Sequence, residues 1–191
     1  AGGVVAVKLA QMIAEDARVP ASYRKLLGSL RDENETMSAA ALWHTLPHTV
    51  RTRMSHLGRC LGTGSVKQVN LGRFGDRPDE PVAVAVLRRR VQDEALASLS
   101  ALEVSEDLAA VASRLGQLVY GEFNLFAEGE ALSSFANTSI GQHPRFRVMR
   151  VKHHSPNCLV EEVAHGQTVA RALRGVSAAA AAAAPEGSTL R

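Results

Sequence analysis

The segment best suited to chemistry is a glycine-rich turn, Gly62-Thr63-Gly64-Ser65. It lies between two stretches, 57–61 and 66–74, whose apolar and β-branched residues predict a pair of strands. Because glycine has no Cβ, backbone N–H groups in such a turn can approach an anion closely. We therefore expect these residues to contact the phosphates of a nucleotide.

The strand expected next lacks the lysine that such sites usually carry. Residues 76–80 have the chemistry of a loop, and the β-branched residues at 81–87 predict a strand. In kinases a G-x-G-x-x-G-x-V turn precedes a V-A-x-K strand. Here the two read G-T-G-S-V-K-Q-V and V-A-V-A, so Lys67 replaces the third glycine and Ala85 replaces the lysine. Since Ala85 cannot reach a phosphate, the plain interpretation is a lobe that binds nucleotide weakly or not at all.

Lys67 offers a replacement for the missing lysine. Side chains alternate between the two faces of a strand, so Lys67 shares a face with Val69, and Ala83 shares a face with Ala85. The resemblance to kinases implies that both pairs face the nucleotide. This arrangement resembles the displaced lysine of the with-no-lysine kinases. We expect Lys67 to pair with Glu128, on a predicted helix, or with phosphates. The alternative is a solvent-exposed lysine on a loop.

The composition excludes several classes of function. Hydrophobic residues make up 46% and charged residues 21% of 191 positions, which is typical of a soluble globular chain of one domain or slightly more. The net charge of +3 is small and no basic face with interleaved aromatics is present, so we expect no nucleic-acid partner. No apolar run has the length of a membrane span.

The cysteines and histidines do not predict a metal centre. Cys60 and Cys158 lack metal or redox spacing, and this cysteine usage indicates a reducing compartment. Pro47 lies between His44 and His48, which opposes ligation by both from one helix. We expect no metal site built from protein ligands alone.

Periodicity and turn chemistry predict an α+β chain. Helices are expected at 2–17, 21–30, 39–45 after a Ser38 cap, 92–115 with a break near Ser105, and 118–135. Strands are expected at 57–61, 66–74, 81–87, 146–151 and 157–163. A polar loop is expected at 137–145, a short helix from 167 to 173, and a low-complexity alanine-rich tail beyond it.

The order of these segments over residues 2–173 resembles the UbiB/ADCK family, the AarF-domain-containing atypical kinase-like proteins. Lys8-Leu9-Ala10-Gln11 resembles the K-x-G-Q signature of the family, with alanine in place of glycine. The glycine turn falls where the family has A-A-A-S-I-G-Q-V-H. Glu122-Phe123-Asn124 resembles its E-x-D with the aspartate neutralised, and Glu162 matches the glutamate of its S-P…L-x-x-E-x-x-x-G hinge.

The resemblance implies a kinase-like N-lobe, in which an antiparallel sheet and a lysine-pairing helix lie beneath an N-terminal helical extension. It implies an extension at 1–56, the lobe at 57–174 and a tail at 175–191. Glu128 would be the lysine-pairing glutamate, and Glu122 with Asn124 a metal-helper pair of reduced charge. Lys8 and Gln11 would reach the site from the extension, the alternative being a solvated helix stripe. Nucleotide contacts are implied for Gly62, Thr63, Gly64, Ser65, Lys67, Val69, Ala83 and Glu162.

The family also implies a biological setting. Its members act in isoprenoid-quinone (coenzyme Q) biosynthesis and lipid homeostasis in mitochondria, plastids and bacteria. For this chain the resemblance implies a pseudokinase with a regulatory or structural role in mitochondrial quinone or lipid metabolism, with ATP and Mg²⁺ as ligands. It implies the matrix side, with membrane association, and partners in a larger mitochondrial complex or the quinone pathway. A plastid is the alternative location.

Catalysis by this chain alone is not expected. We find no D-F-G and no H-R-D segment, which supply the metal-binding and catalytic aspartates of a kinase. Two alternatives stay open. The chain is part of an active atypical kinase or ATPase whose large lobe is absent from this sequence, or it is a non-catalytic subunit of a larger mitochondrial assembly.

Overall fold

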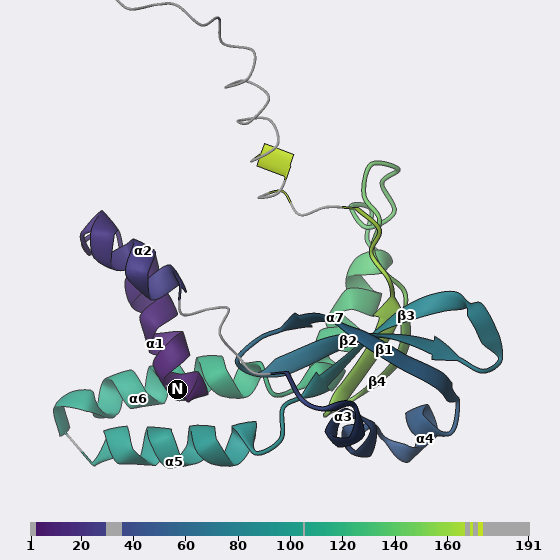
Figure 1. Cartoon of the computed structure of the whole chain (residues 1–191). Helices are drawn as coiled ribbons and strands as arrows, with labels where there is room; N and C mark the ends of the chain where they lie inside the picture. Colours follow the sequence, from purple (N-terminus) through teal and green to yellow (C-terminus); the bar gives the residue numbers. More distant parts are fainter. Residues whose placement is uncertain (1–2, 30–35, 105, 167–168, 170–171, 174–191) are drawn as a thin grey trace, which may run out of the picture.

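The computed structural model describes residues 3–29, 36–104, 106–166, 169 and 172–173, and its centre is an antiparallel sheet (Figure 1). The sheet has five strands in the order β1-β2-β3-β5-β4. The strands are β1 (Met54–Thr63), β2 (Lys67–Phe74), β3 (Arg77–Leu87), β4 (Val151–Ser155) and β5 (Cys158–Glu162). Together with the helices on its two faces, the sheet confirms the predicted α+β class.

The burial of β2 and β3 explains where apolar residues occur along these two strands. β3 is central, and its residues from Val82 to Leu87 are all buried, which accounts for an unbroken apolar run instead of an alternating one. β2 alternates between buried and half-buried side chains along its whole length. Both strand patterns therefore fit a sheet covered on two faces.

Several predicted strand boundaries were wrong. The strand expected at 57–61 is longer at both ends and is β1 (Met54–Thr63). Residues 77–80 were expected to be loop but begin β3, because the turn needs only Gly75 and Asp76. The strand expected at 146–151 starts only at Val151. β4 pairs with β5 alone, and β5 ends at Glu162, whose amide donates to the carbonyl of Arg150. Residues 146–149 thus have no neighbouring strand to complete their hydrogen bonds.

One face of the sheet is covered by α3 (Ala39–Thr45) and α4 (His48–Arg51). Ser38 caps α3 as expected, its hydroxyl accepting from the amide of Ala41 at 3.2 Å. Leu42, Leu46 and Val50 pack on the buried valines of β3. Residues 39–51, within the predicted extension, therefore share a core with the sheet.

A buried polar chain lies on this same face. The amide of Met37 donates to Oε1 of Gln68 at 2.7 Å, and Nε2 of Gln68 donates to Oδ1 of Asn70 at 2.8 Å. Nδ2 of Asn70 then donates to the carbonyl of Gly58 at 2.9 Å. These bonds satisfy the only buried polar side chains of β2 and join the segment before α3 to the β1–β2 hairpin.

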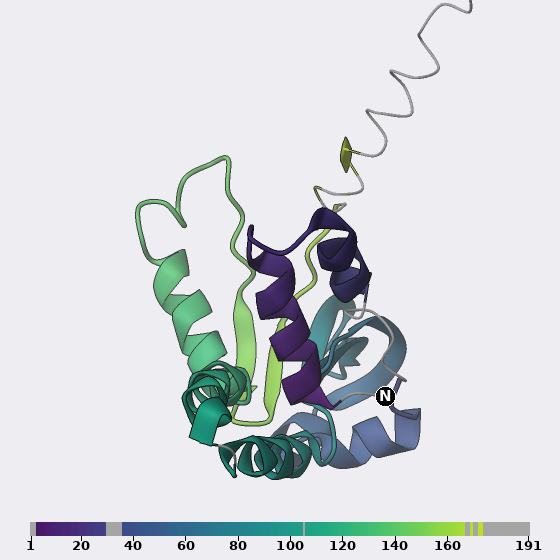
Figure 2. The ribbon, with the colours of Figure 1, turned by 90° about the vertical axis from the view of Figure 1, so that its left-hand side faces the viewer.

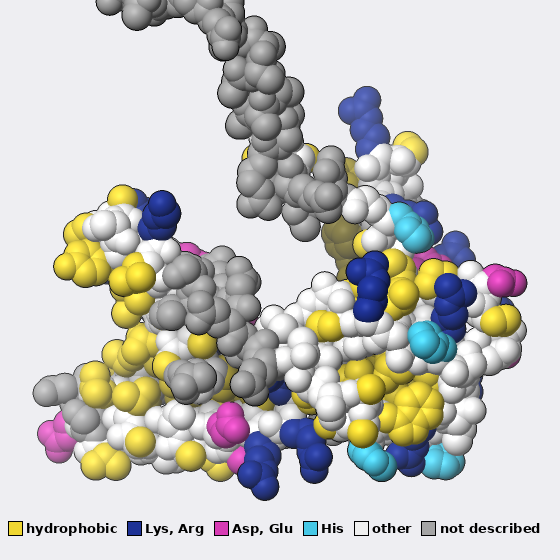
Figure 3. Space-filling view, viewed as in Figure 1, with side chains coloured by type: hydrophobic (Ala, Val, Ile, Leu, Met, Phe, Trp, Pro, Cys, Tyr) yellow, Lys and Arg dark blue, Asp and Glu magenta, His cyan; other side chains and the backbone are white. Residues whose placement is uncertain are grey.

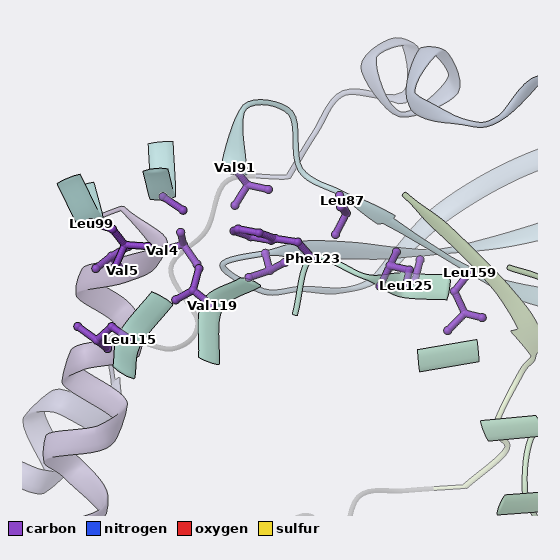
Figure 4. Packing of buried hydrophobic residues seen from close by; sticks show 13 residues of the cluster. Val4, Val5, Leu87, Val91, Leu99, Leu115, Val119, Phe123, Leu125 and Leu159 are labelled. Atoms are coloured by element: carbon purple, nitrogen blue, oxygen red, sulfur yellow. The ribbon is translucent and has the colours of Figure 1, made fainter. Parts of the chain in front are cut away.

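The other face is covered by α7 (Leu125–Ala136) and by the end of an antiparallel pair, α5 (Val91–Glu103) and α6 (Glu106–Gly121). The helix expected at 118–135 is interrupted at residues 122–124. Figure 4 shows the shared core, where Leu87 and Leu159 of the sheet lie near Phe123 and Leu125.

Of the first two helices, α1 (Val4–Glu15) stands against the α5–α6 pair, and α2 (Ala21–Ser29) packs on α1 (Figures 1 and 2). Val4 and Val5 anchor the start of α1 in the same core, with Leu99 of α5 and Leu115 of α6. Apolar side chains gather on the outside of these helices in Figure 3. Tyr23 and Leu26 of α2 are exposed. None of the helices among the described residues is both long and apolar enough to cross a membrane. The predicted helix 167–173 lies mostly, and the tail entirely, outside the described residues.

Candidate functional site

An ion pair between Lys67 and Glu128 marks the candidate site. Nζ of Lys67 lies 2.6 Å from Oε1 and 2.5 Å from Oε2 of Glu128. Their side chains are 35% and 42% exposed, so the pair remains accessible to solvent and to a ligand. The pairing of Lys67 with Glu128, expected from the resemblance to kinases with a displaced lysine, is therefore present.

The sheet and α7 bring these two side chains together. Lys67 opens β2 opposite Leu87, while Glu128 lies in the first turn of α7. α7 is held close to β4 at Gly129, where an added Cβ would lie only 2.6 Å from Cβ of His154. Phe126 packs edge-on against the ring of His154, with centroids 4.7 Å apart. A glycine one position after Glu128 thus permits the close approach that places the carboxylate over β2.

The ion pair lines one wall of a pocket of about 340 Å³. The pocket is lined by Gly64, Ser65, Val66, Lys67, Glu122 and Glu128. Two carboxylates and one ammonium group therefore face a single hollow beside the glycine turn.

A second ion pair joins α1 to Glu122, another residue that lines the pocket. Nζ of Lys8 contacts Oε1 of Glu122, and the Lys8 side chain is 18% exposed. The helical extension is therefore linked to the pocket by the contact of Lys8 with Glu122, although Lys8 is not itself a lining residue. Gln11 is half-buried, and its side chain makes no hydrogen bond with any residue that the structure describes.

Asn124 has a local structural role. It is the N-cap of α7, and its side-chain oxygen accepts from the amide of Ala127 at 3.1 Å. Sequence reasoning placed this residue within a continuous helix, whereas it ends the break between α6 and α7. Within the described ranges no three His, Cys, Asp or Glu side chains cluster as metal ligands would.

The glycine turn is a short hairpin whose backbone groups are partly used in its own hydrogen bonds. Gly62 and Thr63 belong to β1, and the amide of Gly64 donates to the carbonyl of Lys67 at 2.9 Å. The Gly64 N–H is thus used within the hairpin. Neither glycine has a positive φ, so the backbone conformation does not demand glycine here. Thr63 accepts a 2.9 Å bond at Oγ1 from Nη1 of Arg88.

The register of the strands places the remaining predicted residues. Ala83 pairs with Leu71 on one side and Glu161 on the other, and Val69 pairs with Ala85. Directly opposed residues point to the same face, so Val69 and Ala83 lie on the face of Lys67.

Glu162 points to the other face. It pairs with Val82, and Oε1 lies 3.4 Å from Nζ of Lys152. Its carboxylate is therefore separated from the pocket by the sheet, and its amide is already bonded to Arg150.

Sequence reasoning missed Glu161, which shares the face of Lys67 and Ala83. Burial raises the pKa of its carboxyl, and the charge of Glu128 raises that pKa further while Lys67 lowers it. The influence of both charges places Glu161 in the same electrostatic environment as the ion pair. Strand alternation applied to β5 distinguishes Glu161 from Glu162, because adjacent residues of a strand point to opposite faces.

Comparisons with known proteins show similarity at the level of fold. No family model matches the chain, and no curated protein matches it. Among solved structures, the Rv3197–erythromycin complex from Mycobacterium tuberculosis has a TM-score of 0.59 and 23% identity. The match covers 88% of this chain and 46% of Rv3197, so the chain spans less than half of that protein. At this identity the likeness concerns the fold alone.

Proposed function

We propose that this chain is a kinase-like small lobe of UbiB/ADCK type, and that the pocket beside Lys67 binds the phosphates of ATP with Mg²⁺. The observation that supports the proposal is the Lys67–Glu128 ion pair. It reproduces the lysine–glutamate pair of a kinase with the lysine supplied from β2, because Ala85 occupies the usual position on β3.

The side chains around the pocket fit this ligand. Lys67 would donate to phosphate oxygens as a point charge, and Glu128 would hold its ammonium group in place. Glu122 and Glu128 both face the pocket, so a bare triphosphate would be repelled while a nucleotide carrying Mg²⁺ would be accepted. On the same face of the sheet, the half-buried side chains of Val69 and Leu71 offer apolar surface for a base, whereas Ala83 is buried.

We propose that the chain has a regulatory or structural role and that this role depends on nucleotide binding. Setting this role in mitochondrial quinone or lipid metabolism rests on the family resemblance. Phosphoryl transfer needs a catalytic base and metal-binding aspartates. Because none of the residues lining this pocket matches a D-F-G or H-R-D segment, we propose binding without transfer by this chain.

Calorimetric titration with ATP and Mg²⁺ tests the proposal. We expect the wild-type chain to bind and Lys67→Ala to lose at least about tenfold in affinity, since a hydrogen bond to a charged group contributes about 1.5–3 kcal/mol. Lys25→Ala on α2 is the matched control, because Lys25 is exposed and lies outside the pocket lining. Equal affinities of wild type and Lys67→Ala would refute the role of Lys67. No binding by the wild type would refute the function.

A further inference from the structure

Glu161 is an acidic side chain on an otherwise apolar part of the sheet. Its neighbours across the strands are Val151 on β4 and, on the other side, Ala83 on β3 followed by Leu71 on β2. The next residue on this face of β5 toward the core is Leu159, which is 1% exposed. A half-buried carboxyl therefore stands at the edge of the apolar surface formed by Val69, Leu71 and Ala83.

Burying a carboxyl beside apolar neighbours is unfavourable unless it gains a polar partner. Among the described residues, no hydrogen bond or ion pair engages the carboxyl of Glu161, whereas Glu128 and Glu162 both have lysine partners. Lys67 is bound through both oxygens of Glu128. The carboxyl of Glu161 is therefore available to accept a hydrogen bond from a ligand.

We propose that the carboxyl of Glu161 recognises the nucleobase, by accepting a hydrogen bond from an exocyclic amino group of a base lying against the half-buried Val69 and Leu71. The proposal rests on the proposed nucleotide function and adds base selectivity to it. Lys67 and Glu161 would then contact opposite ends of one ligand, the first at the phosphates and the second at the base.

The chemistry of a carboxylate determines which bases this contact favours. An ionised carboxylate only accepts hydrogen bonds, so it favours the 6-amino group of adenine and opposes the 6-oxo group of hypoxanthine. A site that bonds a donor of its ligand discriminates strongly against an analogue without that donor, because its buried acceptor is left unpaired. A charge-assisted bond corresponds to a preference for ATP over inosine triphosphate of about 10- to 100-fold.

Titration of ATP and inosine triphosphate, each with Mg²⁺, tests this proposal on the full chain. We expect the wild type to prefer ATP by about 10-fold or more. In Glu161→Gln the preference should fall to about 1, since an amide can accept from an amino group or donate to an oxo group. Glu162→Gln is the matched control, because the neighbouring carboxylate lies on the opposite face and should leave the preference unchanged.

The outcomes separate the two proposals. Binding with equal affinity for both nucleotides, or a Glu161→Gln variant with the wild-type preference, would overturn base recognition and leave nucleotide binding in place. A Lys67→Ala variant should weaken both nucleotides by the same factor and keep their ratio. Absence of binding by either nucleotide to the wild type would overturn the function and the inference together.

Discussion

Nζ of Lys67 lies 2.6 Å from Oε1 of Glu128, although the two residues are 61 positions apart in the sequence. The contact joins the β1–β2 hairpin to α7 and closes one side of the pocket. Both groups remain partly exposed, which limits what their attraction adds to stability but leaves them available to a ligand.

The first prediction concerns the energy of this pair. In a double-mutant cycle of Lys67→Ala and Glu128→Ala, we expect a coupling free energy of about 0.2–1 kcal/mol, typical of a solvent-accessible pair. Urea unfolding of the four proteins provides the measurement. A coupling above about 3 kcal/mol would indicate a buried pair and contradict the observed exposure.

The second prediction concerns the approach of α7 to β4. Gly129→Ala places a Cβ 2.6 Å from Cβ of His154, so α7 must shift and we expect a loss of about 1–3 kcal/mol in unfolding free energy. Gly62→Ala is the control, because nothing lies within 4 Å of its added Cβ. Denaturant midpoints measure both. Equal midpoints for the two variants would contradict the close contact.

The third prediction follows from the raised pKa of Glu161. The folded state favours the protonated carboxyl, so it binds more protons than the unfolded state between the ordinary pKa of 4.5 and the raised folded value. Stability from this group is present below pH 4.5 and is lost as pH rises through the folded pKa.

Glu161→Gln cannot ionise and should escape this loss. We expect its stability relative to wild type to be greater at pH 7.5 than at pH 4, measured by urea unfolding at each pH. Glu103→Gln, at an exposed position on α5, controls for the removal of one carboxylate. A relative stability that is constant with pH, or that falls as pH rises, would contradict the prediction.

The fourth prediction distinguishes the two thiols. Cys158 is 0% exposed, and burial raises the pKa of its thiol to about 12, so almost no thiolate is present at pH 8. Cys60 is half-buried on β1, an edge strand of the sheet. Iodoacetamide should modify Cys60 alone in the folded protein and both cysteines in urea, as read by mass spectrometry. Modification of Cys158 in the folded protein at the rate of Cys60 would be inconsistent with its burial.

The alternation of side chains along a strand correctly predicted which residues of the candidate site share a face. It placed Lys67 with Val69 on one face and Ala83 with Ala85 on one face, because a period of two is fixed by backbone geometry. The register of β2 and β3 shows that these are the same face of the sheet. The same rule distinguishes Glu161 from Glu162, but the family motif directed attention to Glu162 alone. A motif identifies a position, whereas the register decides the face to which its side chain points.

Other features depend on contacts that periodicity cannot reveal. Asn124 fits a helical pattern equally well as an interior residue or as a cap, and the packing of Phe123 and Leu125 into the core fixes the break before α7. Residues 146–149 have strand-like composition but lack a partner strand, since β5 ends at Glu162. The need for glycine at position 129 leaves no pattern in the nearby sequence, because it arises from the side chain of His154 on β4.

The most direct measurement is labelling with an acyl-phosphate derivative of ATP, in which a lysine amine near the bound phosphates attacks the acyl carbon, forms an amide and releases ATP. Mass spectrometry then identifies the modified lysine. We expect acylation at Lys67, suppressed by excess ATP with Mg²⁺, and ATP-independent labelling at Lys25 and Lys152, which lie outside the pocket lining. Acylation of Lys67 that excess ATP does not reduce, or no acylation of Lys67, would contradict a nucleotide site at this ion pair.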